Sequence, residues 1–219
     1  MKNVIFDFNG TMFLDKDFHK AAWLRYSAEL GHPATEEIFY QHMWGPTNDD
    51  IFTWMFGRKL PRDESDRLGE GKERIYRELC EAFPGGVRLA DGLPEALDAM
   101  KAMGVRMNIA TASAASNVEY YIPKFRLDHW FDCSKIVFDD GTVPQKPDPA
   151  LYRLAAERLG LQPKECVIVE DSMTGYQAAA AAGAGEIVMM DTTMGPEAAA
   201  ALAGVTRVIH DFWGFERYL

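Results

Sequence analysis

Short β-rich runs alternate with helical stretches along most of this chain, and this alternation constrains the fold more than any other feature. Strands are expected at residues 3–8, 105–111, 134–138, 165–170 and 185–190. Helices are expected at residues 93–103, 114–124, 148–159 and 173–182. Because strands separated by helices of this length form parallel sheets with crossover helices, the sequence predicts a doubly wound α/β core.

Residues 15–85 break the alternation, because their apolar positions recur at helical spacing and no convincing strand appears. We therefore expect a small all-helical cap domain at 15–85, inserted into a core domain formed by residues 1–14 and 86–219. The flanking segments, Gly10 to Asp15 and Pro84-Gly85-Gly86, are short connections that could act as hinges.

Composition narrows the function classes. The net charge of -10 is spread along the chain, which argues against nucleic acid or anionic membrane as partner, since both favour basic patches. No apolar stretch reaches the ~18 residues that a membrane span needs. The three cysteines, Cys80, Cys133 and Cys166, form no CxxC pair and indicate neither a disulfide framework nor a zinc site. We expect a soluble, cytoplasmic protein, either a monomer or a weak homodimer.

The apolar run Val4-Ile5-Phe6 ends at Asp7, in a turn tight enough to require Gly10. A carboxylate directly after a buried strand lies at the edge of the sheet where α/β proteins bind ligands. The turn Phe8-Asn9-Gly10-Thr11 would also point successive backbone N–H groups at phosphoryl oxygens, with Gly10 allowing close approach. Asp7 is therefore the first catalytic candidate, although a capping Asp in an ordinary turn has the same pattern.

Three later segments could supply the rest of a phosphoryl-transfer site. Thr111 ends an apolar run and offers a hydroxyl donor, and Ser113 is an alternative candidate for the same role. Lys146 precedes Pro147, which favours an extended backbone, so we expect Lys146 to begin a loop that faces the site. Glu170-Asp171 ends a further run, where it could equally cap the next helix. Because attack of a carboxylate on phosphorus brings two anions together, a divalent cation such as Mg²⁺ is expected, held by Asp7, Asp171 and the carbonyl of Asn9.

This ordered set resembles the haloacid dehalogenase superfamily of phosphohydrolases, and the helical insertion with Lys146-Pro147-Asp148-Pro149 and Glu170-Asp171-Ser172-Met173-Thr174-Gly175 looks most like its beta-phosphoglucomutase-like branch. The resemblance implies that Asp7 is the nucleophile and that Glu170 and Asp171 anchor Mg²⁺. By the same resemblance the candidate catalytic residues are Asp7, Asn9, His19, Thr111 and Lys146. The candidate substrate-binding residues are Gly10, Thr11, Ala112, Ser113, Gly45 and Lys72. The candidate metal ligands are Asp7, Asn9, Glu170 and Asp171.

Two positions depart from the family pattern. Asn9 stands where the family carries a second Asp, and an amide cannot act as general acid or base, a loss of ~10²- to 10⁴-fold in rate. His19 is the best substitute, because an imidazole titrates near neutral pH. Asn48 stands where the sugar phosphomutase carries a phosphate-gripping Arg. This second departure favours a monophosphate hydrolase over a mutase.

The sequence therefore predicts an Mg²⁺-dependent phosphatase that hydrolyses a small, sugar-phosphate-like metabolite through an aspartyl-phosphate on Asp7. Two alternatives stay open. A phosphomutase is disfavoured by Asn48, and a phosphometabolite-binding protein with impaired turnover is favoured by Asn9.

Overall fold

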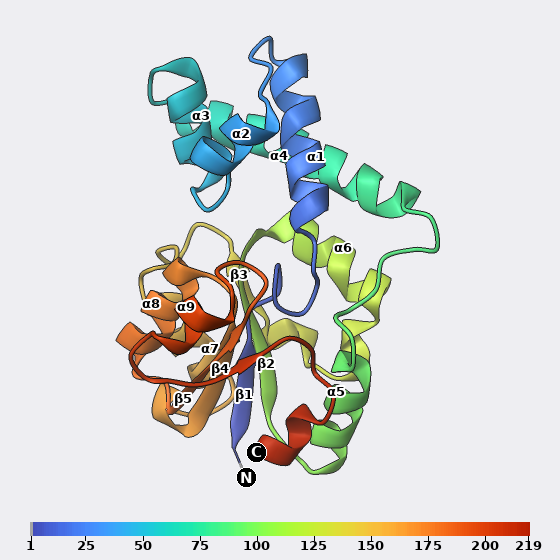
Figure 1. Cartoon of the computed structure of the whole chain (residues 1–219), viewed down its shortest axis with the longest axis vertical. Helices are drawn as coiled ribbons and strands as arrows, with labels where there is room; N and C mark the ends of the chain where they lie inside the picture. The colour runs from blue at the N-terminus through green and yellow to red at the C-terminus, as the bar shows by residue number, and fades with distance from the viewer. Residues whose placement is uncertain (1) are drawn as a thin grey trace. The chain divides into compact units, whose positions relative to one another are not determined.

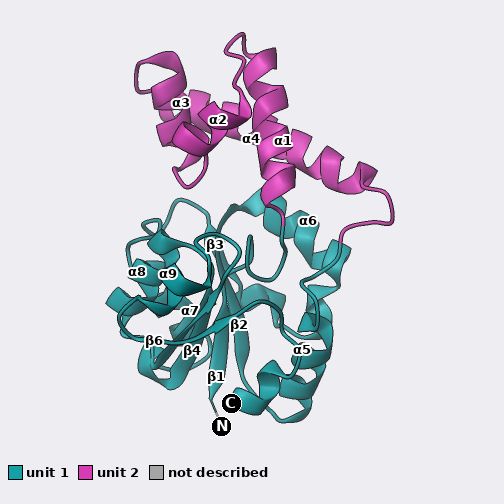
Figure 2. Cartoon of the chain, in the orientation of Figure 1, with its two compact units in different colours: residues 1–14, 88–219 teal, residues 15–87 magenta. Residues whose placement is uncertain are grey.

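The computed structural model describes residues 2–219. Within them the chain forms two compact units, shown in separate colours in Figure 2. The segment Asp15–Val87 forms the helical unit, and the rest of the described chain forms the core unit. The helical unit thus extends two residues beyond the boundary expected at residue 85.

The core unit is built on a six-stranded sheet in which every neighbouring pair is parallel. Its strands are β1 (Asn3–Phe6), β2 (Met107–Ala114), β3 (Val137–Asp139), β4 (Cys166–Glu170), β5 (Glu186–Met190) and β6 (Val205–Ile209). Their order is β3-β2-β1-β4-β5-β6. The predicted doubly wound α/β class is confirmed. The edge strand β6 was not predicted, because the exposed Thr206 and Arg207 interrupt its apolar run.

Helices cover both faces of this sheet, as Figure 1 shows. The helices of the core unit are α5 (Leu93–Ala102), α6 (Ala115–Phe125), α7 (Ala150–Arg158), α8 (Met173–Ala182) and α9 (Pro196–Ala200). Short 3-10 turns are η2 (Leu127–His129), η3 (Cys133–Lys135), η4 (Pro163–Glu165) and η5 (Phe215–Tyr218). On one face, Leu151 of α7 and Ala178 of α8 pack against Ile5 and Ile168 in one buried cluster. Small alanines on α8 let that helix lie close to the strands.

The opposite face of the sheet carries an aromatic cluster. The ring centroid of Phe6 on β1 lies 6.3 Å from that of Phe131, 6.1 Å from that of Phe212 and 6.4 Å from that of Phe215. These four rings are all buried. Strand β1 is therefore covered on both faces, which explains why its sequence is a continuous apolar run instead of an alternating one.

The helical unit contains α1 (Lys16–Glu29), α2 (Glu36–Ile38), a π-helical turn η1 (Phe39–Met43), α3 (Asn48–Phe56) and α4 (Arg62–Ala82). No strand occurs between Asp15 and Val87, all of which the structure describes. Its core holds the buried side chains of Trp23, Phe39, Phe52, Ile75 and Tyr76. A capping box at Thr47 and Asp50 begins α3. Across residues 2–219, no helix is both long and apolar enough to cross a bilayer.

The order of the strands creates a switch point between β1 and β4. These strands are neighbours, and the chain adds strands outward from them in opposite directions. Crevices for ligands in doubly wound sheets lie at the carboxyl ends of the strands at such a point. Asp7 follows β1 and Asp171 follows β4, so both lie at this crevice. Thr111, expected at a strand end, lies inside β2, which continues to Ala114.

Candidate active site at the carboxyl ends of the strands

The turn after β1 places Asp7 and brings the backbone close to Asp171. The Asp7 N–H donates to the Val169 carbonyl at 2.9 Å, which extends the pairing of β1 with β4 by one residue. Gly10 has a φ of +78°, and a Cβ there would lie 2.3 Å from Oδ2 of Asp171. Both the backbone conformation and the close approach require glycine at this position, as the sequence indicated.

Lys146 joins two acidic residues that lie far apart in the chain. Its Nζ donates to Oδ1 of Asp7 at 2.6 Å and to Oε1 of Glu170 at 2.6 Å. The Lys146 side chain is 6% exposed, so these charge-assisted hydrogen bonds form away from bulk water. The structure therefore brings together three of the residues expected from separate sequence motifs.

Glu170 is held by hydrogen bonds at both of its carboxylate oxygens. Oε1 accepts from Lys146 and from the Tyr152 hydroxyl, each at 2.6 Å. Oε2 accepts from the Asp171 N–H at 2.9 Å, the Ser172 N–H at 3.1 Å and the Ser172 hydroxyl at 3.0 Å. A Cβ at Gly175 would lie 1.8 Å from this carboxylate, so the first turn of α8 closes over it. Glu170 thus has a fixed orientation.

Asp171 is contacted by the loop that follows β5. The Thr193 hydroxyl donates to Oδ2 of Asp171, and the Thr192 hydroxyl donates to the Gly10 carbonyl at 2.8 Å. Thr192 also lies 3.5 Å from Oδ2 of Asp171. The sequence analysis missed both threonines. Their position directly after the strand that ends at Met190 was the available signal, because that loop emerges at the same edge of the sheet.

Burial and mutual repulsion shift the protonation of this carboxylate cluster. Burial, opposed by Lys146 and reinforced by Glu170, raises the pKa of Asp7 to about 7. Burial and the charges of Glu170 and Asp7 raise the pKa of Asp171 well above its usual value. Burial also disfavours the charged form of Glu170, but the charge and hydrogen bond of Lys146, with the hydrogen bonds from Tyr152 and Ser172, together lower the Glu170 pKa. Asp7 and Asp171 are therefore the carboxyls whose charged forms a bound cation would stabilise most.

These residues fit a hard divalent cation. One carboxylate oxygen from each of Asp7, Glu170 and Asp171 lies within 4.8 Å of the others. Oxygen ligands and clustered negative charge suit Mg²⁺. In the residue after Gly10, the buried Oγ1 of Thr11 has no hydrogen-bond partner and could contact a bound group. Because both oxygens of Glu170 are already engaged, Asp7 and Asp171 are the better candidates for direct contact with a metal.

Asn9 is held among polar side chains from β2 and α6. Its Oδ1 accepts from the Ser113 hydroxyl at 2.5 Å and lies 3.4 Å from Oγ1 of Thr111. Its Nδ2 donates to the Tyr121 hydroxyl at 2.9 Å. The Ser113 N–H in turn donates to Oγ1 of Thr111 at 3.1 Å. The structure therefore groups Asn9 with Thr111 and Ser113, while Ala112 between them is exposed.

The candidate residues His19, Gly45 and Lys72 belong to the helical unit. Nζ of Lys72 lies 3.1 Å from Nδ1 of His19, and an ammonium can only donate, so Nδ1 accepts. The other ring nitrogen, Nε2, lies 3.2 Å from Oδ2 of Asp15. Both nitrogens of His19 are thus engaged within its own unit. Gly45 has a φ of +105° and open space around it.

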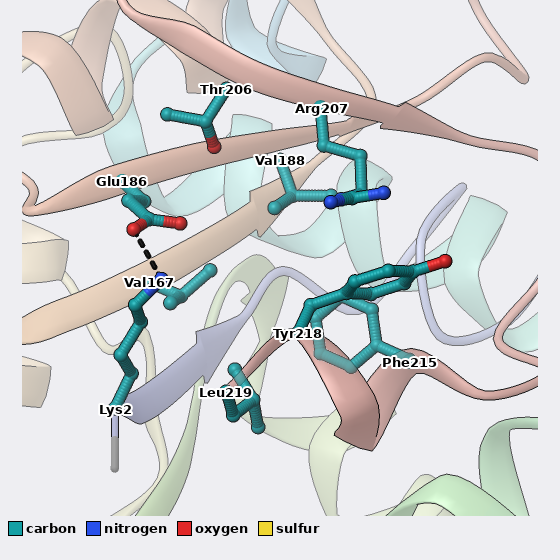
Figure 3. Close-up of a pocket in the computed structure, with 9 residues that line it drawn as sticks. All are labelled: Lys2, Val167, Glu186, Val188, Thr206, Arg207, Phe215, Tyr218 and Leu219. Carbon is teal, nitrogen blue, oxygen red and sulfur yellow. Dashed lines mark hydrogen bonds and ion pairs between the residues drawn. The ribbon is translucent and has the colours of Figure 1, made fainter.

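A separate small cavity lies between strands β4, β5 and β6 and the carboxyl-terminal turn η5 (Figure 3). Lys2, which pairs with Glu186, lines it together with Thr206, Arg207 and Tyr218. Its volume is about 80 Å³. Ligand pockets usually measure roughly 300–1,000 Å³. This cavity is too small for a sugar phosphate and contains none of the candidate catalytic residues.

A doubly wound parallel sheet with buried carboxylates and a lysine at its switch point is an arrangement suited to an enzyme that transfers phosphoryl groups. Comparison with known proteins agrees. The family model of haloacid dehalogenase-like hydrolases matches residues 1–183. The chain belongs to this family, which confirms the predicted superfamily and a hydrolase as the class of enzyme.

Individual relatives refine this assignment. A Thermotoga maritima protein described as a phosphorylated carbohydrates phosphatase is 29% identical over 183 residues, which cover 84% of this chain and 82% of the relative. A solved Entamoeba histolytica hydrolase of family IA, variant 3, is 30% identical with a TM-score of 0.89, over 97% of this chain and 94% of that one. A Thermotoga maritima structure provisionally assigned as a beta-phosphoglucomutase is 26% identical with a TM-score of 0.73, over 100% and 98% of the two chains. These matches support the predicted phosphatase and the beta-phosphoglucomutase-like branch.

Proposed function

We propose that this protein is an Mg²⁺-dependent phosphatase that hydrolyses a small phosphorylated carbohydrate through a phosphorylated Asp7. The observation that carries the proposal is the contact of Lys146 with both Asp7 and Glu170, with Asp171 in the same cluster. The relative described as a phosphorylated carbohydrates phosphatase supports the substrate class. Cytoplasmic residence and the oligomeric state stay predictions of the sequence.

In the first step, an oxygen of Asp7 attacks phosphorus and the bond from phosphorus to the substrate oxygen breaks. Lys146 would stabilise the charge on the phosphoryl oxygens, with the hydroxyl of Thr111 as a further donor. The N–H groups of Gly10 and Thr11, expected to face the anion, donate instead to the carbonyls of Phe13 and Phe8. When bound by Asp7, Asp171 and the Asn9 carbonyl, Mg²⁺ would neutralise charge on the phosphate and on the nucleophile. Glu170 keeps Lys146 in place through its fixed carboxylate.

In the second step, water attacks the phosphorus of the acyl phosphate, phosphate leaves and Asp7 is restored. Asn9 can neither protonate the departing alcohol nor take a proton from this water. We therefore expect the hydrolysis of esters with poor leaving groups to be slow and phosphorylated Asp7 to persist. His19 stays a candidate for proton transfer, although Lys72 and Asp15 engage both of its nitrogens.

A second function, the binding of a phosphometabolite without turnover, is favoured by the environment of Asn9. Ser113 and Tyr121 hold the Asn9 amide in one orientation, which suits a group that binds a ligand without transferring a proton. A mutase is disfavoured, because the Nδ2 of Asn48 donates to Glu73 at 3.3 Å and offers no clamp for a second phosphate.

The test is a panel of phosphorylated sugars and an aryl phosphate, with phosphate release measured with and without Mg²⁺. We expect the parent protein to release phosphate only with Mg²⁺ and the Asp7→Asn variant to be inactive. If Asp7→Asn releases phosphate as fast as the parent, Asp7 is not the nucleophile. If the parent binds sugar phosphates in calorimetry but releases nothing, the binding function replaces the enzyme.

A further inference from the structure

Tyr152 on α7 contacts the catalytic cluster although no sequence motif pointed to it. Its side chain is 0% exposed, and its ring packs in the core among Leu151, Ala155 and Ala156. At the far end of the ring, the hydroxyl donates to Oε1 of Glu170 at 2.6 Å. Phe would fill the same core volume, so packing alone does not explain this hydroxyl.

A second contact joins the same ring to Lys146. Nζ of Lys146 lies 4.8 Å from the centroid of the Tyr152 ring, within the range of a cation–π interaction. The same ammonium donates to Oε1 of Glu170, which also accepts from Tyr152. Lys146, Glu170 and Tyr152 thus form a closed triangle of contacts.

The geometry of Glu170 shows what the hydroxyl contributes. Oε2 is fixed by the N–H and hydroxyl groups of Asp171 and Ser172 at the start of α8. Oε1 has two acceptor positions, and one is filled by Lys146 and the other by Tyr152. Without the hydroxyl, rotation about the terminal bond of Glu170 would be less restrained at Oε1, and Lys146 would follow it away from Asp7.

We propose that Tyr152 is a positioning residue, which holds the Lys146 ammonium against Asp7 through its hydroxyl bond to Glu170 and its ring. This inference rests on the proposed phosphatase function. It goes beyond it because Tyr152 touches neither substrate nor the reacting atoms. A misplacement of about 1 Å at a reacting group can lower the rate by ~10²-fold, so a restraint on the position of Lys146 should raise kcat.

The experiment compares Tyr152→Phe with Tyr176→Phe, which removes the same atom at a distance from the site. Tyr176 lies on α8, and its hydroxyl donates to the Ala203 carbonyl at 2.7 Å. We expect Tyr152→Phe to lower kcat by about tenfold, with KM and melting temperature near those of Tyr176→Phe. A fall in melting temperature with unchanged kcat would make Tyr152 an ordinary core residue and would overturn the proposal.

A double-mutant cycle with Lys146→Met separates positioning from general structural damage. If Tyr152 acts through Lys146, Tyr152→Phe should have almost no further effect on kcat once the ammonium is gone. Equal effects in both backgrounds would contradict the proposal. The two outcomes differ even if Tyr152→Phe alters stability slightly, because stability effects persist in both backgrounds.

Binding of inorganic phosphate, measured by calorimetry with Mg²⁺, extends the cycle to a protein without turnover. We expect Tyr152→Phe to weaken phosphate binding by about fivefold in the parent background, because the charge-assisted contact of Lys146 with phosphate becomes less well positioned. In the Lys146→Met background we expect no such effect. If turnover is absent but this coupling appears, the phosphatase proposal fails and the positioning role stands. If the parent binds no phosphate at millimolar concentration, the positioning role fails as well.

Discussion

Each unit of this protein buries one lysine beside a glutamate, yet the two lysines have different surroundings. In the helical unit, Lys72 pairs with Glu73 at 2.7 Å, and its side chain is 3% exposed. In the core unit, Lys146 pairs with Asp7 and Glu170, and its side chain is 6% exposed. Burial alone therefore does not distinguish them.

The two regions differ in charge balance. Lys72 meets one carboxylate, and its remaining contacts include the His19 ring and the faces of Trp23 and Tyr76. Lys146 lies in a cluster of three carboxylates. Burial of excess negative charge costs stability, which a protein tolerates where a cation or substrate will bind. We infer that the excess of buried negative charge around Lys146 marks the catalytic cluster, while the substrate-binding role expected for Lys72 stays a prediction.

The largest expected difference is between Lys146→Met and Lys72→Met. Lys146→Met should lower kcat by ~10²- to 10³-fold, because a preorganised charge at the phosphoryl group is lost. Lys72→Met should instead destabilise the protein by about 3 kcal/mol, because it removes the cation that pairs with the buried Glu73 carboxylate. Enzyme assays and thermal unfolding of both variants check this. An equal loss of kcat in the two variants, at equal stability, would remove the distinction between the regions.

Asn9→Asp should raise kcat by ~10²-fold, because an acid and base is restored at the leaving group and the attacking water. The change also adds a fourth carboxylate to the unbalanced region, so we expect a lower melting temperature without Mg²⁺. Asn48→Asp, which also sets a carboxylate beside another one, Glu73, is the control for added charge, with no gain in kcat. A kcat for Asn9→Asp at or below that of the parent would show that the encoded amide does not limit turnover.

Substitution of two helical glycines, one in each unit, tests the same difference between the Lys146 cluster and the helical unit. A Cβ at Gly175 would meet Glu170 at 1.8 Å, and a Cβ at Gly71 would meet the Tyr26 hydroxyl at 2.3 Å. Gly175→Ala should lower kcat by about tenfold or more, because it displaces the glutamate that holds Lys146. Gly71→Ala should change stability and leave kcat nearly intact. Steady-state kinetics of the two variants measure this, and similar kcat losses would contradict it.

The smallest expected effect is a dependence of stability on pH in metal-free protein. The Asp7 pKa is raised from 3.8 to about 7, so the folded state binds more protons than the unfolded state between these values. The stabilising contribution of Asp7 is therefore present at low pH and is lost as the pH rises toward 7. Melting temperature between pH 5 and 8 should fall less in Asp7→Asn than in the parent. An identical slope in both proteins would contradict the raised pKa.

The sequence predicted most of the core fold because its signals are local. Buried central strands such as β1 and β4 are continuous apolar runs, and residues at their ends can be located without knowledge of packing. The edge strand β6 lacked this signal, because it is only partly buried. The end of β2 was placed three residues early, since Ala112 to Ala114 carry no strong strand preference.

The sequence predicted the candidate site only in part. Asp7, Lys146, Glu170 and Asp171 were found because each adjoins a strand end or a proline, and the structure places them in contact. Tyr152, Thr192 and Thr193 were missed, since a tyrosine on a helix face and threonines in a loop are common without any site role. Their contacts depend on how α7 and the loop after β5 pack, which no local pattern encodes.

The central claim is that Asp7 becomes phosphorylated, and direct detection of that bond is its sharpest test. The protein is mixed with an aryl phosphate and Mg²⁺, quenched in acid within seconds and digested, and the peptides are analysed by mass spectrometry. Because Asn9 cannot activate water, we expect phosphate on the peptide that contains Asp7, at a higher level than in Asn9→Asp. Release of phosphate with no phosphorylated Asp7 at any quench time, or with phosphate on another residue, would contradict it.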